Sequence, residues 1–187
     1  MNNTTTTFSC IILAGGEGKR VDGRDKGLIN FQGKPLIQHV LDAVSPQVDE
    51  IIISANRNIK QYADYGYKVV SDATNQYHGP LAGIAATLPA CRHNWVLVVP
   101  CDMPFLPADL IATLAEDLTH TNLSIAESEN RLQLVFLIHK NLAPSLQQSL
   151  QNEQLKLMQW IKSQQPAIQQ NFKHSYFQNF NHAKDLL

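Results

Sequence analysis

Glycines and basic side chains crowd the stretch that follows the first apolar run of the chain. It reads Leu13-Ala14-Gly15-Gly16-Glu17-Gly18-Lys19-Arg20. Glycines let the backbone come close to a ligand and turn its amides toward phosphate oxygens, while Lys19 and Arg20 add positive charge. The stretch is neither a Walker A loop nor a G-x-G-x-x-G fingerprint, so it lacks both of those signatures. It predicts a phosphate-binding loop, with a plain tight turn as the alternative.

A second basic cluster, Arg24-Asp25-Lys26-Gly27-Leu28, comes a few residues later. Lys26 could fold back onto the same phosphates as the glycine-rich stretch. A surface charge cluster is the alternative when these residues are read alone. The glycines and Arg20 nearby favour phosphate binding.

A carboxylate follows the apolar run of residues 95–99, in Val99-Pro100-Cys101-Asp102-Met103-Pro104-Phe105-Leu106-Pro107. Prolines restrict the loop and would hold Asp102 rigidly. A hard oxygen ligand that shares a cation with waters and substrate phosphates is how proteins usually hold Mg²⁺. Asp102 is therefore the predicted metal ligand, with a helix cap or turn as the alternative.

A further polar cluster begins at Ser71-Asp72 and continues at Gly79-Pro80-Leu81-Ala82-Gly83. The glycines permit a flat base or a ribose to approach the backbone closely. Asp72 could accept hydrogen bonds from ligand hydroxyl or amine groups. A turn followed by an ordinary helix cap is the alternative.

Composition excludes several other classes of protein. The 187 residues are 44% apolar and 17% charged with a net charge of -1, which is typical of a globular protein and not of a broad basic surface that binds duplex nucleic acid. Cys10, Cys91 and Cys101 fit neither a zinc site nor a disulfide framework, so we expect buried, reduced thiols. No targeting or membrane-spanning segment is evident. These features favour a cytoplasmic protein that has neither nucleic acid nor membrane as a partner.

Short apolar runs that alternate with amphipathic stretches must position these clusters. The runs predict strands at residues 8–13, 51–53, 68–70 and 95–99, and helices at residues 35–44, 59–65, 81–88 and 108–118. Continuously apolar strands separated by helices indicate an α/β fold with a mainly parallel sheet covered on both faces. Each polar cluster then lies at the carboxyl ends of strands, where such sheets bind ligands.

The last third of the chain is less regular. Residues 123–126 and 134–138 could be strands, and residues 142–150 and 156–163 could be helices. Neither an internal repeat nor a long linker divides the chain. We therefore expect one domain over residues 1–187.

Taken in order, these motifs resemble those of the molybdenum cofactor guanylyltransferase family, MobA. The shared segments are Leu13-Ala14-Gly15-Gly16, Arg20, Asp25-Lys26-Gly27, Gly33-Lys34-Pro35-Leu36, Ala55-Asn56-Arg57, Gly79-Pro80-Leu81-Ala82-Gly83, Pro100-Cys101-Asp102-Met103-Pro104 and Asn179-Phe180-Asn181. Val21 and Asp22 stand where the family usually has Met and Gly, and His182 stands where Thr is common.

The resemblance implies a three-layer, Rossmann-like nucleotidyltransferase fold. It implies transfer of GMP from GTP to the terminal phosphate of molybdenum-loaded molybdopterin with release of pyrophosphate. Residues 8–107 would bind the nucleotide and the C-terminal part would bind the pterin. Proteins that carry or accept the molybdenum cofactor are candidate partners.

The resemblance also assigns roles to single residues. Lys26 and Arg20 would offset charge on the leaving pyrophosphate, while Mg²⁺ on Asp102 would bridge the α-phosphate and the attacking group. The binding residues that it implies are Leu13, Ala14, Gly15, Gly16, Lys26, Asn56, Asp72, Gly83, Asp102, Asn179 and Asn181.

Two rival functions remain. A sister transferase that uses CTP, or a sugar-nucleotide pyrophosphorylase, would resemble a Leu-Ala-Ala-Gly start more closely and would lack the Asp-Lys-Gly triplet. A regulatory module that binds nucleotide without catalysis would not need Lys26 and Asp102.

Overall fold

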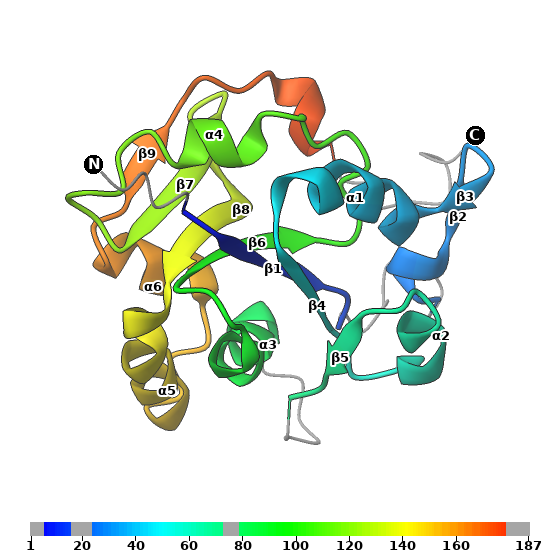
Figure 1. Ribbon diagram of the computed structural model, residues 1–187. Helices are drawn as coiled ribbons and strands as arrows, with labels where there is room; N and C mark the ends of the chain where they lie inside the picture. The colour runs from blue at the N-terminus through cyan, green and yellow to red at the C-terminus, as the bar shows by residue number, and fades with distance from the viewer. Residues whose placement is uncertain (1–5, 16–23, 73–78, 179–187) are drawn as a thin grey trace.

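The computed structural model describes residues 6–15, 24–72 and 79–178. Its main strands are β1 (Phe8–Leu13), β4 (Glu50–Ser54), β5 (Lys68–Val70), β6 (Trp95–Pro100), β7 (Leu123–Ser128), β8 (Arg131–His139) and β9 (Ala167–Gln169). They form one seven-stranded sheet in the order β5-β4-β1-β6-β8-β7-β9 (Figure 1). A separate small hairpin pairs β2 (Asn30–Phe31) with β3 (Lys34–Pro35).

The parallel part of the sheet consists of β5, β4, β1 and β6. Ile11, Ile12 and Val98 are fully buried, which explains why these strands are apolar at successive positions and not only at alternate ones. Leu13 pairs in register with Ser54 on one side and with Pro100 on the other. The carboxyl ends of the three central strands therefore meet at one edge of the sheet.

The sheet continues beyond β6 with a mixture of directions. β8 is antiparallel to both β6 and β7, whereas β9 is parallel to β7. The prediction of a mainly parallel sheet is confirmed. The strands expected at 123–126 and 134–138 are present and are longer than expected, while β9 was not predicted.

Helices cover both faces of the sheet (Figure 1). One face packs against α1 (Leu36–Val44) and α4 (Leu110–Leu114), and the other packs against α3 (Gly79–Thr87), α5 (Ala143–Gln151) and α6 (Leu157–Ser163). The three layers expected from the sequence are thus confirmed. Within residues 6–15, 24–72 and 79–178, no helix combines the length and the apolar character that a membrane crossing requires.

Shorter elements complete the fold. They are α2 (Ile59–Ala63) and the 3₁₀ helices η2 (Lys26–Leu28), η3 (Ser45–Gln47), η4 (Leu88–Ala90), η5 (Lys140–Leu142) and η6 (His174–Phe177). Among these, η2 carries Lys26, one of the predicted catalytic residues.

Several helix boundaries differ from the predicted ones. Pro35 is extended and precedes α1, so it does not occupy the first helical position. The first turn of α3 includes Gly79 and Pro80, which we had expected to form a turn before it. α2 ends at Ala63, not at residue 65.

The helix predicted at residues 108–118 shrinks to α4, which covers Leu110–Leu114. Its first turn has no side-chain cap. Glu116 and Asp117 follow its end, where negative charge opposes the helix dipole. Both features disfavour extension of the helix.

Candidate functional site

An ion pair joins two of the predicted catalytic residues. The Lys26 ammonium donates a hydrogen bond to Asp102 Oδ2 over 3.2 Å. Lys26 lies in η2, whereas Asp102 lies just beyond β6, 76 residues later. The two side chains are only 22% and 12% exposed. Partial burial strengthens the field that such a pair exerts on a charged ligand.

Asp102 keeps capacity to bind a further group. Among the described residues, Lys26 is its only hydrogen-bonding partner. A carboxylate has two oxygens with several lone pairs, so Asp102 can accept more than this one bond. Asp102 could therefore hold a divalent cation that completes its shell with waters and ligand phosphates. No group of three potential metal-ligating side chains occurs in the described ranges, so they hold no all-protein metal cage.

A second group gathers around Asn56 and Asp72. Asn56 Oδ1 accepts a hydrogen bond from the Asp72 backbone N–H over 3.0 Å. A Cβ atom placed on Gly15 would lie 3.7 Å from Asn56 Nδ2, so the glycine-rich stretch begins beside this pair. Asp72 Oδ1 is buried and lacks a hydrogen-bond partner in the part of the chain that the structure describes. An orphaned buried acceptor is costly unless a ligand satisfies it.

Backbone contacts hold the strand ends that carry these residues. The Ala14 N–H donates to Ser54 O over 2.8 Å, and the Cys101 N–H donates to Leu13 O over 3.0 Å. A Cβ atom on Gly83 would lie 2.8 Å from Ser54 Oγ and 3.7 Å from Leu13 Cδ2. Gly83 therefore lets α3 pack directly on the ends of β1 and β4.

The predicted site residues inside the described ranges thus share one edge of the sheet. Lys26 pairs with Asp102, and Asn56 pairs with Asp72. Between these two pairs lie the ends of β1 and β4, with Leu13, Ala14, Gly15 and Gly83. Gly16, Arg20, Asn179 and Asn181 lie outside the described residues, as does Asp22.

Sequence reasoning missed a buried polar cluster directly behind Lys26. Asp25 accepts hydrogen bonds from Tyr62 Oη and Asn58 Nδ2, and it lies 3.6 Å from Arg57 Nε. Asp25 and Arg57 both lie inside motifs shared with the MobA family, and this position could have marked them as functional. No motif contains Tyr62, and a single tyrosine in a short amphipathic stretch resembles any core residue.

Cys101, next to Asp102, is not suited to act as a nucleophile. Burial raises the pKa of its thiol well above the ordinary value, and the nearby carboxylates of Asp102 and Asp25 raise it further. The thiolate is the reactive form of cysteine, and this environment suppresses it.

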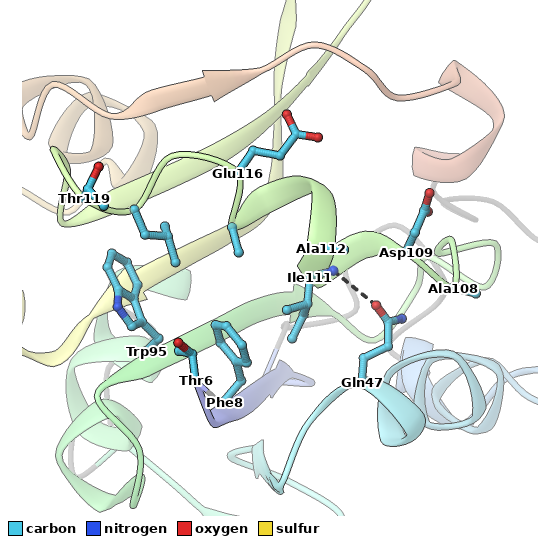
Figure 2. Close-up of a pocket in the computed structure, with 12 residues that line it drawn as sticks. Thr6, Phe8, Gln47, Trp95, Ala108, Asp109, Ile111, Ala112, Glu116 and Thr119 are labelled. Atoms are coloured by element: carbon cyan, nitrogen blue, oxygen red, sulfur yellow. Dashed lines mark hydrogen bonds between the residues drawn. The ribbon is translucent and has the colours of Figure 1, made fainter. Parts of the chain in front are cut away.

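A cavity of about 610 Å³ lies elsewhere on the molecule (Figure 2). Phe8 and Trp95, which line it, are the first residues of β1 and β6. Ile111 also lines it and donates a backbone hydrogen bond to the Gln47 side chain. This cavity is therefore at the edge of the sheet opposite to Lys26 and Asp102.

Comparisons with known proteins match nearly the whole chain. The model of the MobA-like NTP transferase domain matches residues 10–168. The molybdenum cofactor guanylyltransferase of Pasteurella multocida is 40% identical over 187 residues, which is 97% of this chain and 98% of that protein. That of Polynucleobacter asymbioticus is 44% identical over 160 residues, which is 81% of this chain and 80% of that protein.

Solved structures share the fold. Molybdopterin-guanine dinucleotide biosynthesis protein A from Archaeoglobus fulgidus superposes with a TM-score of 0.77, covering 95% of this chain and 94% of that one. Sequence identity is 22%, so this likeness concerns the fold. It confirms the nucleotidyltransferase architecture.

Proposed function

The chain belongs to the MobA-like NTP transferase family, and from that premise we propose that it transfers GMP from GTP to molybdenum-loaded molybdopterin. Relatives that are 40% identical over most of the chain are named molybdenum cofactor guanylyltransferase. The family indicated by the sequence motifs is thereby confirmed. In the structure, the observation that carries the proposal is the Lys26–Asp102 pair at the carboxyl edge of the sheet.

The reaction needs charge neutralisation and alignment. An oxygen of the terminal pterin phosphate attacks the α-phosphorus of GTP, the bond between the α-phosphorus and its bridging oxygen breaks, and pyrophosphate leaves. No covalent enzyme intermediate is required. Lys26 and Arg20 offset the negative charge that accumulates on the leaving pyrophosphate. Asp102 holds Lys26 in place before the nucleotide binds.

Mg²⁺ fits the chemistry of Asp102, which is a hard oxygen ligand with lone pairs to spare. When bound there, Mg²⁺ would neutralise charge on the nucleotide phosphates. Lys26, already hydrogen-bonded to the same carboxylate, would supply a second positive charge for the phosphates.

Nucleotide recognition falls to the residues around Asn56 and Asp72. The buried, unpartnered Asp72 Oδ1 supports this assignment, because a hydroxyl or amine of the ligand would satisfy it. The full set of residues that we assign to substrate binding is Leu13, Ala14, Gly15, Gly16, Lys26, Asn56, Asp72, Gly83, Asp102, Asn179 and Asn181.

We assign one domain to residues 1–187, in which residues 8–107 bind the nucleotide and the C-terminal part binds the pterin. Membership of β7, β8 and β9 in the same sheet as β1 supports a single unit. Proteins that carry or accept the molybdenum cofactor are the expected partners. The free, buried cysteines favour the reducing environment of the cytoplasm.

A pyrophosphate-release assay with molybdenum-loaded molybdopterin and Mg²⁺ tests the proposal. We expect release with GTP and much less with CTP at equal concentration. Asp102→Asn, which keeps the side-chain shape, should lower the rate at least about 10²-fold, as loss of one preorganised charged group does. Asp109→Asn, at an exposed carboxylate preceding α4, is the matched control and should keep the wild-type rate.

Each rival function gives a different result in that assay. Equal or faster release with CTP would refute the guanine assignment. Binding of GTP without release of pyrophosphate would identify a regulatory module. A wild-type rate for Asp102→Asn would refute the role of Asp102.

A further inference from the structure

A single buried carboxylate organises the turn that carries Lys26. The Asp25 side chain is only 5% exposed. Its Oδ1 accepts hydrogen bonds from Tyr62 Oη over 2.5 Å and from the Gly27 N–H over 3.3 Å. Its Oδ2 accepts from Asn58 Nδ2 over 2.9 Å and faces Arg57 Nε at 3.6 Å. Donors from two separate segments therefore converge on one side chain.

This arrangement fixes the backbone of η2 against α2. Asp25 is the N-cap of η2, so its carboxylate holds the start of the turn at Gly27. Tyr62 lies in α2, and Asn58 is the N-cap of that helix. Asn58 makes no side-chain cap bond to its own helix, and its amide nitrogen donates to Asp25. Asn58 also has a φ of 51°, which only a few residue types adopt readily.

Close packing behind Lys26 leaves no room for a side chain at Gly27. A Cβ atom on Gly27 would lie 2.5 Å from Tyr62 Oη and 3.2 Å from Cys101 Sγ. The turn therefore rests on Tyr62 and on the residue next to Asp102. Asp25 faces this interior contact, while the adjacent Lys26 extends to Asp102.

We propose that Asp25 and Tyr62 are positioning residues that set the direction in which Lys26 is presented to Asp102 and to the nucleotide phosphates. This inference deepens the proposed function and rests on it for its catalytic consequence. Burying a carboxylate is costly unless its lone pairs are satisfied, and here the donors that satisfy it also lock the turn. Tyr62 acts on the reaction only through Asp25 and Lys26.

Tyr62→Phe tests the proposal because it removes one hydroxyl and preserves the ring. We expect kcat for pyrophosphate release to fall by about 10- to 100-fold, the usual effect of misplacing a catalytic group by about 1 Å. The KM for GTP should change much less. Tyr65→Phe is the matched control, because Tyr65 is a half-buried tyrosine just beyond α2 with no hydrogen bond to Asp25. It should keep the wild-type kcat.

Asn58→Gly is a second, gentler variant. Glycine accepts the positive φ of this position, so the change removes only the amide that donates to Asp25 Oδ2. It should lower kcat in the same direction as Tyr62→Phe. This variant keeps the test available if Tyr62→Phe does not fold.

Acetylation of lysines by an acylating reagent, followed by mass spectrometry, reports on Lys26 without any need for activity. Lys26 should react about fivefold faster in Tyr62→Phe and in Asn58→Gly than in the wild type, the factor that corresponds to one ordinary hydrogen bond. Exposed Lys60 serves as the internal reference and should react equally in all proteins.

Wild-type kcat and wild-type Lys26 reactivity in folded Tyr62→Phe would overturn the proposal, even if its melting temperature is lower. If the wild-type protein releases no pyrophosphate from GTP, the proposed function is refuted. Faster acetylation of Lys26 in the two variants would still support the positioning role in that case.

Discussion

At the scale of single residues, the two buried carboxylates near η2 differ in how their oxygens are used. Asp25 accepts hydrogen bonds from Tyr62, Asn58 and Gly27, so both of its carboxylate oxygens are already bonded to protein groups. Asp102 receives only the Lys26 ammonium among the described residues. The first carboxylate holds structure, and the second remains able to bind a cation or a ligand.

Sequence motifs marked Lys26 and Asp102 as candidate catalytic residues but did not mark the residues that support Lys26. Lys26 and Asp102 could be predicted because each lies in a short motif with an evident chemical purpose. The Tyr62–Asp25 hydrogen bond joins residues 37 positions apart, and no local pattern marks it. Tertiary hydrogen bonds of this kind depend on how α2 packs, which the sequence does not display.

The three thiols should be unreactive toward an aromatic disulfide reagent at pH 8. Burial raises the pKa of Cys91 to about 12, and burial also raises those of Cys10 and Cys101 above the ordinary value. Thiols with raised pKa values stay protonated at this pH and do not attack. We expect no rapid labelling of the native protein and labelling of all three thiols in denaturant. One fast-reacting thiol per native chain would contradict this.

At the scale of elements, the central strands were the easiest to predict. The bounds of β1 agree with the expected residues 8–13, because a nearly continuous apolar run has few other ways to be buried. The bounds of β5, an edge strand, also agree with the expected residues 68–70. β9 is only three residues long and its residues are at most half-buried, so it lacked any periodicity. It forms because β7 offers it an edge to pair with.

The junction of α3 and β4 provides a test of packing between elements. A Cβ atom on Gly83 would lie 2.8 Å from Ser54 Oγ, so Gly83→Ala should lower the free energy of unfolding by about 1–3 kcal/mol through overpacking. In a Ser54→Ala background the obstructing oxygen is gone. There Gly83→Ala should be neutral or stabilising by up to about 1 kcal/mol, because alanine favours helix. Equal losses in both backgrounds, measured by denaturant unfolding, would refute the contact.

At the scale of the whole molecule, Glu50 connects segments that are distant in the sequence. It accepts hydrogen bonds from Ser9 Oγ over 2.6 Å and from the Arg92 backbone N–H over 2.6 Å, and it pairs with Arg92 Nε at 3.1 Å. These contacts lie at the start of β4, at the edge of the sheet opposite to Asp102. They join β1, β4 and the loop before β6.

Glu50 should make stability depend on pH. Burial alone would raise its pKa, but the hydrogen bonds from Ser9 and Arg92 lower it below the ordinary 4.5. Because the folded-state pKa lies below the unfolded one, this stabilisation is full above about pH 4.5 and is lost as the pH falls through the folded-state pKa. Glu50→Gln should lower the free energy of unfolding at pH 7 by about 2 kcal/mol.

Denaturant unfolding measured from pH 7 to pH 3 would check this expectation. The difference between wild type and Glu50→Gln should shrink below about pH 4.5. Glu116→Gln, at an exposed carboxylate, is the control and should track the wild type. A difference that stays constant with pH would show that the charge of Glu50 contributes nothing.

The strand order β5-β4-β1-β6-β8 has a consequence for synthesis on the ribosome. The first four of these strands all come from residues 8–100, so one half of the sheet can assemble on the nascent chain. Until residues 131–139 have been synthesised, the outer edge of β6 has no neighbour, because these residues form its partner β8. Unpaired apolar edges are templates for pairing with other chains. The pace of translation between these two strands therefore sets how long the growing polypeptide remains open to aggregation.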